Sequence, residues 1–84
     1  MSTYAILNVS GERTTGTAPH YGVIVSTFFD RLDAYRALDA MIDRGEATYD
    51  RHTWRVGLVG AAAGVGSRLR YTEVPDTRGW EGTL

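Results

Sequence analysis

Residues 21–45 have the sequence YGVIVSTFFDRLDAYRALDAMIDRG, in which a strand pattern passes directly into a helix pattern. The first part, from Tyr21 to about Ser26, is rich in β-branched residues and predicts a strand. Further along, apolar side chains recur at helical spacing and form one stripe, which predicts an amphipathic helix that buries this stripe. The stripe consists of Ala34, Tyr35, Leu38, Met41 and Ile42.

Both ends of this helix carry sequence signals. Thr27 with Asp30, or Asp30 with Asp33, has the spacing of a capping box. In a capping box a side chain accepts hydrogen bonds from the free N–H groups of the first turn. Acidic residues there also suit the positive end of the helix dipole. Gly45 is placed to end the helix in the left-handed conformation.

Three more strands are predicted outside this segment. Thr3–Val9 alternates in the manner of a strand and is joined to the strand at Tyr21 by a polar loop, Ser10–His20, so the two are expected to form an antiparallel hairpin. Tyr49–Val59 and Ser67–Val74 are predicted to be strands as well. The small and flexible segment between them, Gly60–Gly66, is predicted to be a hairpin loop.

The predicted architecture is a single α+β domain over residues 1–84 with the order β-β-α-β-β, a small antiparallel sheet with one helix packed on one face. Residues 76–84 are expected to form a C-terminal tail, with Trp80 as a plug over the sheet edge. One helix covers about one face of a sheet. The other face is therefore expected to be solvated, covered by the tail, or used against a partner.

Composition excludes several classes of function. The chain has 84 residues, no cysteine and a net charge of −1, and its nine basic residues are all arginine. The lack of cysteine excludes disulfides and a thiol nucleophile, and the near-neutral charge argues against strong non-specific nucleic-acid binding. No signal-peptide pattern and no apolar run long enough to span a bilayer are visible. We therefore expect a cytoplasmic protein with no membrane partner.

No motif indicates catalysis, a cofactor or a metal. The glycine-rich segment GLVGAAAGVGS, from Gly57 to Ser67, is not a phosphate-binding loop, because that loop needs a lysine and the chain has none. His20 and His52 lack the spacing of metal ligands, and no serine has a nucleophile context. We predict no catalytic residue, no cofactor and no metal, and thus a protein that is not an enzyme.

Two polarised surfaces are candidates for binding a partner. Residues 30–46, which include the helix, carry five acidic and three basic side chains. In this segment Asp30 and Asp33 are the candidate contacts for a basic patch on another protein.

The second candidate surface combines arginine with tyrosine. Tyr49, Arg51 and Arg55 share one face of a predicted strand, and Arg68 and Arg70 join them if the last two strands pair. Such a face can stack bases and hold phosphates, or it can serve as a protein hot spot, where tyrosine and arginine are enriched. No RNA-binding string supports the first use, so a protein partner is favoured.

In size, lack of cysteine and lysine, and β-β-α-β-β order, the chain resembles short orphan accessory proteins of phages and mobile elements, of the anti-CRISPR and anti-defence type. The resemblance implies a non-enzymatic inhibitor that binds a defence or nucleic-acid-handling complex in the cytoplasm of a bacterial host. Two alternatives stay open. One is a small nucleic-acid-binding protein that uses the arginine and tyrosine face. The other is a structural subunit of a homo-oligomer, such as a homodimer, that buries the open sheet face.

Overall fold

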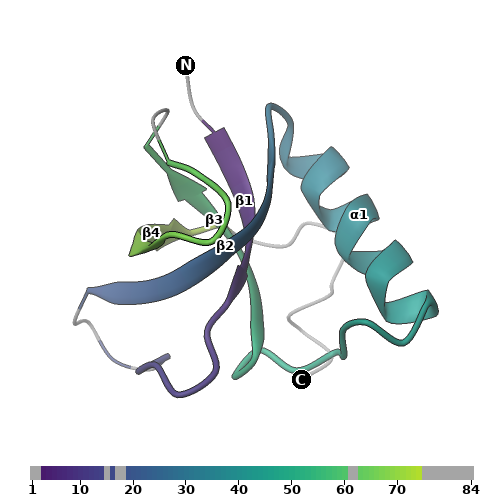
Figure 1. Cartoon of the computed structure of the whole chain (residues 1–84), viewed down its shortest axis with the longest axis horizontal. Helices are drawn as coiled ribbons and strands as arrows, with labels where there is room; N and C mark the ends of the chain where they lie inside the picture. Colours follow the sequence, from purple (N-terminus) through teal and green to yellow (C-terminus); the bar gives the residue numbers. More distant parts are fainter. Residues whose placement is uncertain (1–2, 15, 17–18, 61–62, 75–84) are drawn as a thin grey trace.

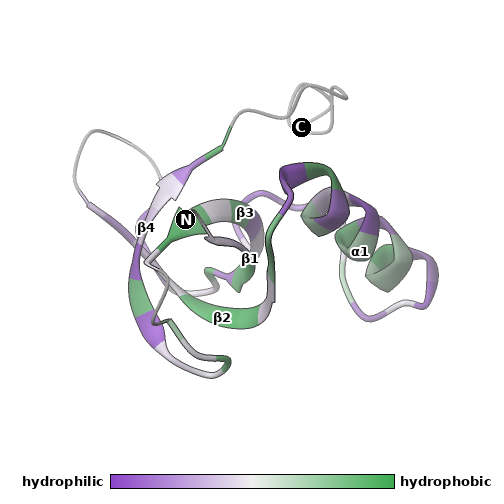
Figure 2. Cartoon of the chain, turned by 90° about the horizontal axis from the view of Figure 1, so that it is seen from above, coloured by the Kyte–Doolittle hydropathy of each residue, from purple (hydrophilic) through white to green (hydrophobic). Residues whose placement is uncertain are grey.

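The computed structural model describes residues 3–14, 16, 19–60 and 63–74. Four antiparallel strands close into a barrel in the order β1-β2-β4-β3, and one helix lies beside it (Figure 1). Seen from above, the strands form a ring and the helix lies outside it (Figure 2). The elements are β1 (Thr3–Asn8), β2 (His20–Phe28), α1 (Arg31–Asp43), β3 (Trp54–Val59) and β4 (Arg68–Glu73).

The α+β class, the antiparallel pairing and the single helix are confirmed, but the sheet is closed. β1 pairs with both β2 and β3, and β4 pairs with the same two strands. A bulge in β2 helps the sheet to curve, because Ile6 pairs with Ser26 whereas the next residue, Leu7, pairs with Ile24. The β1–β2 and β3–β4 hairpins are as predicted, while the pairing of β2 with β4 was not anticipated.

Because the sheet closes into a barrel, the sheet face that points away from α1 is not an open surface. This face lines the barrel interior and is filled by the protein's own buried side chains. The prediction that it is solvated, covered by the tail or used against a partner is therefore wrong, and so is the open sheet face that suggested a homo-oligomer. Trp80 and the tail lie outside the described residues. The interior side chains are Ala5, Leu7, Val9, Ile24, Val59 and Tyr71.

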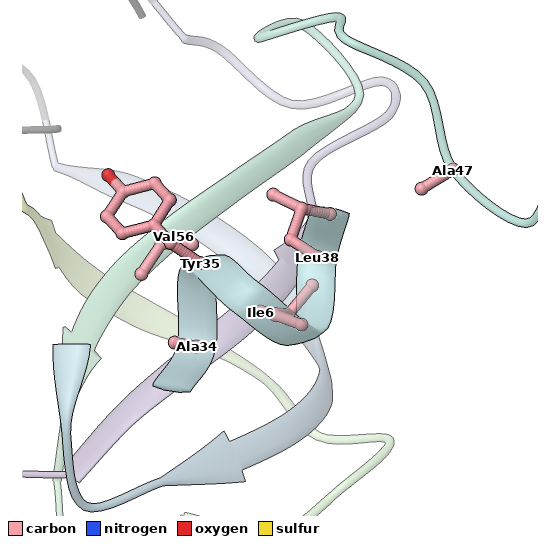
Figure 3. Close-up of a cluster of buried hydrophobic side chains, with 6 residues drawn as sticks. All are labelled: Ile6, Ala34, Tyr35, Leu38, Ala47 and Val56. Carbon is pink, nitrogen blue, oxygen red and sulfur yellow. The ribbon is translucent and has the colours of Figure 1, made fainter. Parts of the chain in front are cut away.

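A second core cluster joins α1 to the outside of the barrel. Ile6 of β1 and Val56 of β3 face the helix, where Tyr35 and Leu38 cover them (Figure 3). Alternation along β1 thus serves two cores, because Ile6 points to the helix while Leu7 points into the barrel. The Tyr35 hydroxyl donates to the Val74 carbonyl oxygen at 3.0 Å, which fastens the helix to the end of β4.

The helix ends follow the sequence signals. The Asp30 carboxylate accepts from the Leu32 N–H at 2.8 Å, so Asp30 is the N-cap, while Thr27 still belongs to β2. Gly45 has φ of 78°. The N–H groups of Gly45 and Glu46 donate to carbonyl oxygens of the last helical turn at 3.0 and 2.8 Å, as in a Schellman motif. No helix within the described residues is long and apolar enough to cross a membrane.

The strand predicted to begin at Tyr49 begins only at Trp54, because Asp50 holds the intervening residues in a turn. The Asp50 carboxylate accepts from the His52 N–H at 2.9 Å and from the Thr53 hydroxyl at 2.8 Å. These hydrogen bonds hold the pKa of Asp50 below its ordinary value. Local bonds of this kind compete with strand pairing, which explains the shorter strand.

Candidate interaction surface

Arg55 is fully buried, so the prediction that it contributes to an exposed binding face is wrong. It falls on the side of β3 that faces the barrel interior. Its Nε donates to the Arg51 carbonyl oxygen at 2.7 Å and its Nη2 to the Thr14 carbonyl oxygen at 3.1 Å. Its Nη1 donates to the Glu73 carboxylate. Arg55 therefore ties two loops and β4 together, which is a structural role.

Arg51 and Tyr49 are not in register with Arg55, because both lie before β3. The half-buried Arg51 side chain has its Nη2 at 3.5 Å from Glu73 Oε1. The Tyr49 hydroxyl donates to Asp39 Oδ1 of α1 at 3.4 Å. The predicted arginine and tyrosine face is thus divided between separate parts of the surface.

Arg68 and Arg70 do share an exposed face, and two residues of β2 complete it. In the β2–β4 pairing, Tyr21 lies opposite Arg70 and Val23 lies opposite Arg68. All four residues are exposed on the outside of the barrel, and we call them the β2–β4 face. Tyr21 and Val23 were not among the residues predicted for this face. Their alternation with buried Ile24 was a signal, but the strand opposite them could not be read from the sequence.

The Arg68 side chain is held on this face by two neighbours. Its guanidinium carbon lies 4.6 Å from the centre of the Tyr21 ring, a cation–π arrangement. Its Nε and Nη2 donate to the Glu12 carboxylate at 2.6 and 2.8 Å. This bidentate pair lowers the pKa of Glu12 and raises that of Arg68. The result is a pre-positioned arginine–tyrosine pair.

Arg70 differs from the other arginines of the predicted site. Arg51 and Arg55 pair with Glu73, and Arg68 pairs with Glu12. Arg70 is exposed, and within the part of the chain that the structure describes no carboxylate pairs with it. Arg70 is therefore the uncompensated charge of the β2–β4 face.

Asp30 and Asp33 lie at the start of α1, away from that face. Asp30 is engaged as the N-cap, and Asp33 Oδ1 lies 3.9 Å from Arg36 Nη1 on the same helix. Next to them Phe29 is 81% exposed, which the sequence analysis did not single out. A shallow hollow at this place is lined by Tyr4, Phe29, Asp30, Arg31 and Leu32. We call it the helix-start patch.

The histidines do not belong to a metal site in the part of the chain that the structure describes. His52 Nδ1 lies 3.0 Å from the Thr14 hydroxyl, next to the Arg55 cluster. Among the described residues, no three His, Asp or Glu side chains gather as a metal site would require.

No family model, curated protein or solved structure matches the chain. Inference about function therefore depends on these surfaces.

Acidification is expected to release Arg68 from Glu12. Because the pKa of Glu12 is lowered in the folded state, the pair stabilises the fold fully above the unfolded-state pKa, about 4.3 for glutamate. This stabilisation is lost as the pH falls through the lower folded-state pKa. Carbon-detected NMR of the Glu12 carboxyl should give a lower titration midpoint in the wild type than in Arg68→Ala.

The matched control for that titration is Glu46. Its lowered pKa depends on Arg44, so Arg68→Ala should leave it unchanged. Equal Glu12 midpoints in the wild type and Arg68→Ala would show that the pair does not form in solution.

Proposed function

We propose that this chain is a non-enzymatic protein-binding module. The observation that supports this best is the β2–β4 face, where the Arg68 side chain is already fixed over Tyr21 by Glu12. Tyrosine and arginine are the side chains enriched at protein hot spots. A side chain fixed before binding loses less conformational entropy on binding, so more of its contact energy becomes affinity.

The charge distribution favours a protein over a nucleic acid as the partner. Nucleic-acid affinity comes largely from arginine and lysine side chains that neutralise phosphates. In the predicted arginine set, Arg51, Arg55 and Arg68 are paired with carboxylates. The net charge of the chain is −1. Nucleic-acid binding is therefore kept as an alternative outcome of the test below.

The proposed target is a bacterial defence or nucleic-acid-handling complex, which the chain would inhibit by binding as an accessory protein of a phage or mobile element. This choice rests on the resemblance in size and composition. It determines which extract to use for the test, namely that of a bacterial host carrying such complexes.

Affinity capture from bacterial extract tests the function. We expect the tagged full chain to retain a stoichiometric protein partner, identified by mass spectrometry, in both untreated and nuclease-treated extract. A partner retained only before nuclease treatment would mean that nucleic acid carries the contact. If no protein is retained in extracts that contain defence complexes, the proposed function is wrong.

A further inference from the structure

We infer that the β2–β4 face binds an acidic protein segment in which a carboxylate lies next to an apolar side chain. This inference rests on the proposed protein-binding function and names the chemistry of the partner. It follows from the charges and the exposed apolar groups of the face.

The charge of the face selects an anion at one position. Glu12 already neutralises Arg68 with two hydrogen bonds, whereas Arg70 is exposed and without such a pair among the described residues. A guanidinium offers a planar fork that a carboxylate can accept in bidentate fashion. A basic segment would be repelled by Arg70, so the partner is acidic at this point.

The neighbours of Arg70 select an apolar group beside that anion. Tyr21 lies directly opposite Arg70 and is 37% exposed, and Val23 lies opposite Arg68 and is 36% exposed. Covering these side chains contributes about 25 cal/mol per Å² of apolar area.

Glu12 argues against a phosphate chain as the occupant. A nucleic acid carries phosphates at regular intervals along its backbone. Phosphates next to one held by Arg70 would meet the Arg68–Glu12 pair, which has no net positive charge to hold them. A protein segment can place one carboxylate at Arg70 and an apolar side chain toward Tyr21 and Val23.

A displayed random peptide library tests the inference without knowledge of the natural partner. Peptides are selected on the full wild-type chain and counter-selected on Arg70→Glu. We expect the enriched sequences to contain aspartate or glutamate next to an aromatic or aliphatic residue. Synthetic peptides of these sequences should bind Arg70→Glu at least about tenfold more weakly than the wild type, and Tyr21→Ala similarly.

A matched variant distinguishes a loss of binding at the β2–β4 face from an effect of charge reversal elsewhere on the molecule. Arg36→Glu reverses an exposed arginine on α1 and should leave peptide affinity unchanged. A thermal melt of each variant confirms that it is folded. Enrichment of basic peptides, equal affinity for Arg70→Glu, or no enriched sequence would overturn the inference.

The inference and the proposed function can fail separately. If affinity capture yields a protein partner whose binding survives Arg70→Glu, the module binds protein through another surface, such as the helix-start patch. The partner chemistry stated here is then wrong, although the function stands. If a single-stranded oligonucleotide competes with the selected peptides at physiological salt, the partner class itself is wrong.

Discussion

Replacing Arg55 by leucine is expected to lower the free energy of unfolding by about 3 kcal/mol or more, which is a large part of the stability of a small domain. Arg55 is fully buried and donates to Glu73 and to the carbonyl oxygens of Arg51 and Thr14. The leucine variant removes these three donors together. Their acceptors then lose their hydrogen-bond partners, which costs free energy unless water replaces the donors. Glu73 is already 31% exposed, so solvent screens its remaining charge and the effect falls toward the lower end of the range for buried pairs.

Urea denaturation of Arg55→Leu, with Arg55→Lys and Arg70→Leu beside it, measures this effect. Arg55→Lys keeps the charge but offers no fork that reaches three acceptors, so we expect it to stay about 2 kcal/mol less stable than the wild type. Arg70→Leu makes a similar change at an exposed position and should stay within about 0.5 kcal/mol. An unfolding midpoint of Arg55→Leu equal to that of the wild type would contradict the structural role of Arg55.

Replacing Gly57 by alanine is expected to cost about 3 kcal/mol, at the upper end of the range for overpacked cores. A Cβ atom at Gly57 would lie 2.5 Å from Tyr71 Cδ2 and 2.9 Å from Leu7 Cδ1. Both neighbours are buried inside the barrel. The Tyr71 ring carbon is not the end of a flexible chain, so relief requires the ring or a strand to move.

Gly60→Ala is the matched control for Gly57→Ala. No atom lies within 4 Å of a Cβ built there, so this variant should unfold at about the wild-type urea concentration. The double variant Gly57→Ala/Tyr71→Ala should lose less stability than the sum of the two single changes, because removing the ring makes room for the new methyl group. Strict additivity would mean that the contact with Tyr71 is not the cause.

Elements whose signals are local could be predicted from the sequence alone. Asp30 and Gly45 fix the ends of α1, because a side-chain cap and a left-handed residue act on backbone groups a few positions away. Alternation along Thr3–Val9 predicted a strand, and its neighbouring residues Ile6 and Leu7 do lie on opposite faces. These features depend on residues within one turn or one strand, and reading them needs no knowledge of distant partners.

Which of the two faces of a strand lies inside depends on how the sheet closes. β3 carries Trp54, Val56 and Leu58 on one side and Arg55 with Gly57 on the other. Closure places the side with the arginine in the barrel interior, where Gly57 makes room for a tyrosine ring. Gly57 belongs to the predicted strand Tyr49–Val59, next to the predicted loop Gly60–Gly66, and no packing role was predicted for it. Only its contact with Tyr71, which lies outside that segment, shows that it serves close packing.

The binding surface depended on tertiary structure for the same reason. Local hydrogen bonds of Asp50 keep Tyr49 and Arg51 outside β3. Arg55 does not contribute to the surface, because it is buried. Arg68 and Arg70 kept the exposed positions that alternation predicted. Their neighbours came from β2 through a pairing between strands far apart in the sequence. Strand alternation defines two faces, whereas the pairing that sets their neighbours depends on how the whole chain closes.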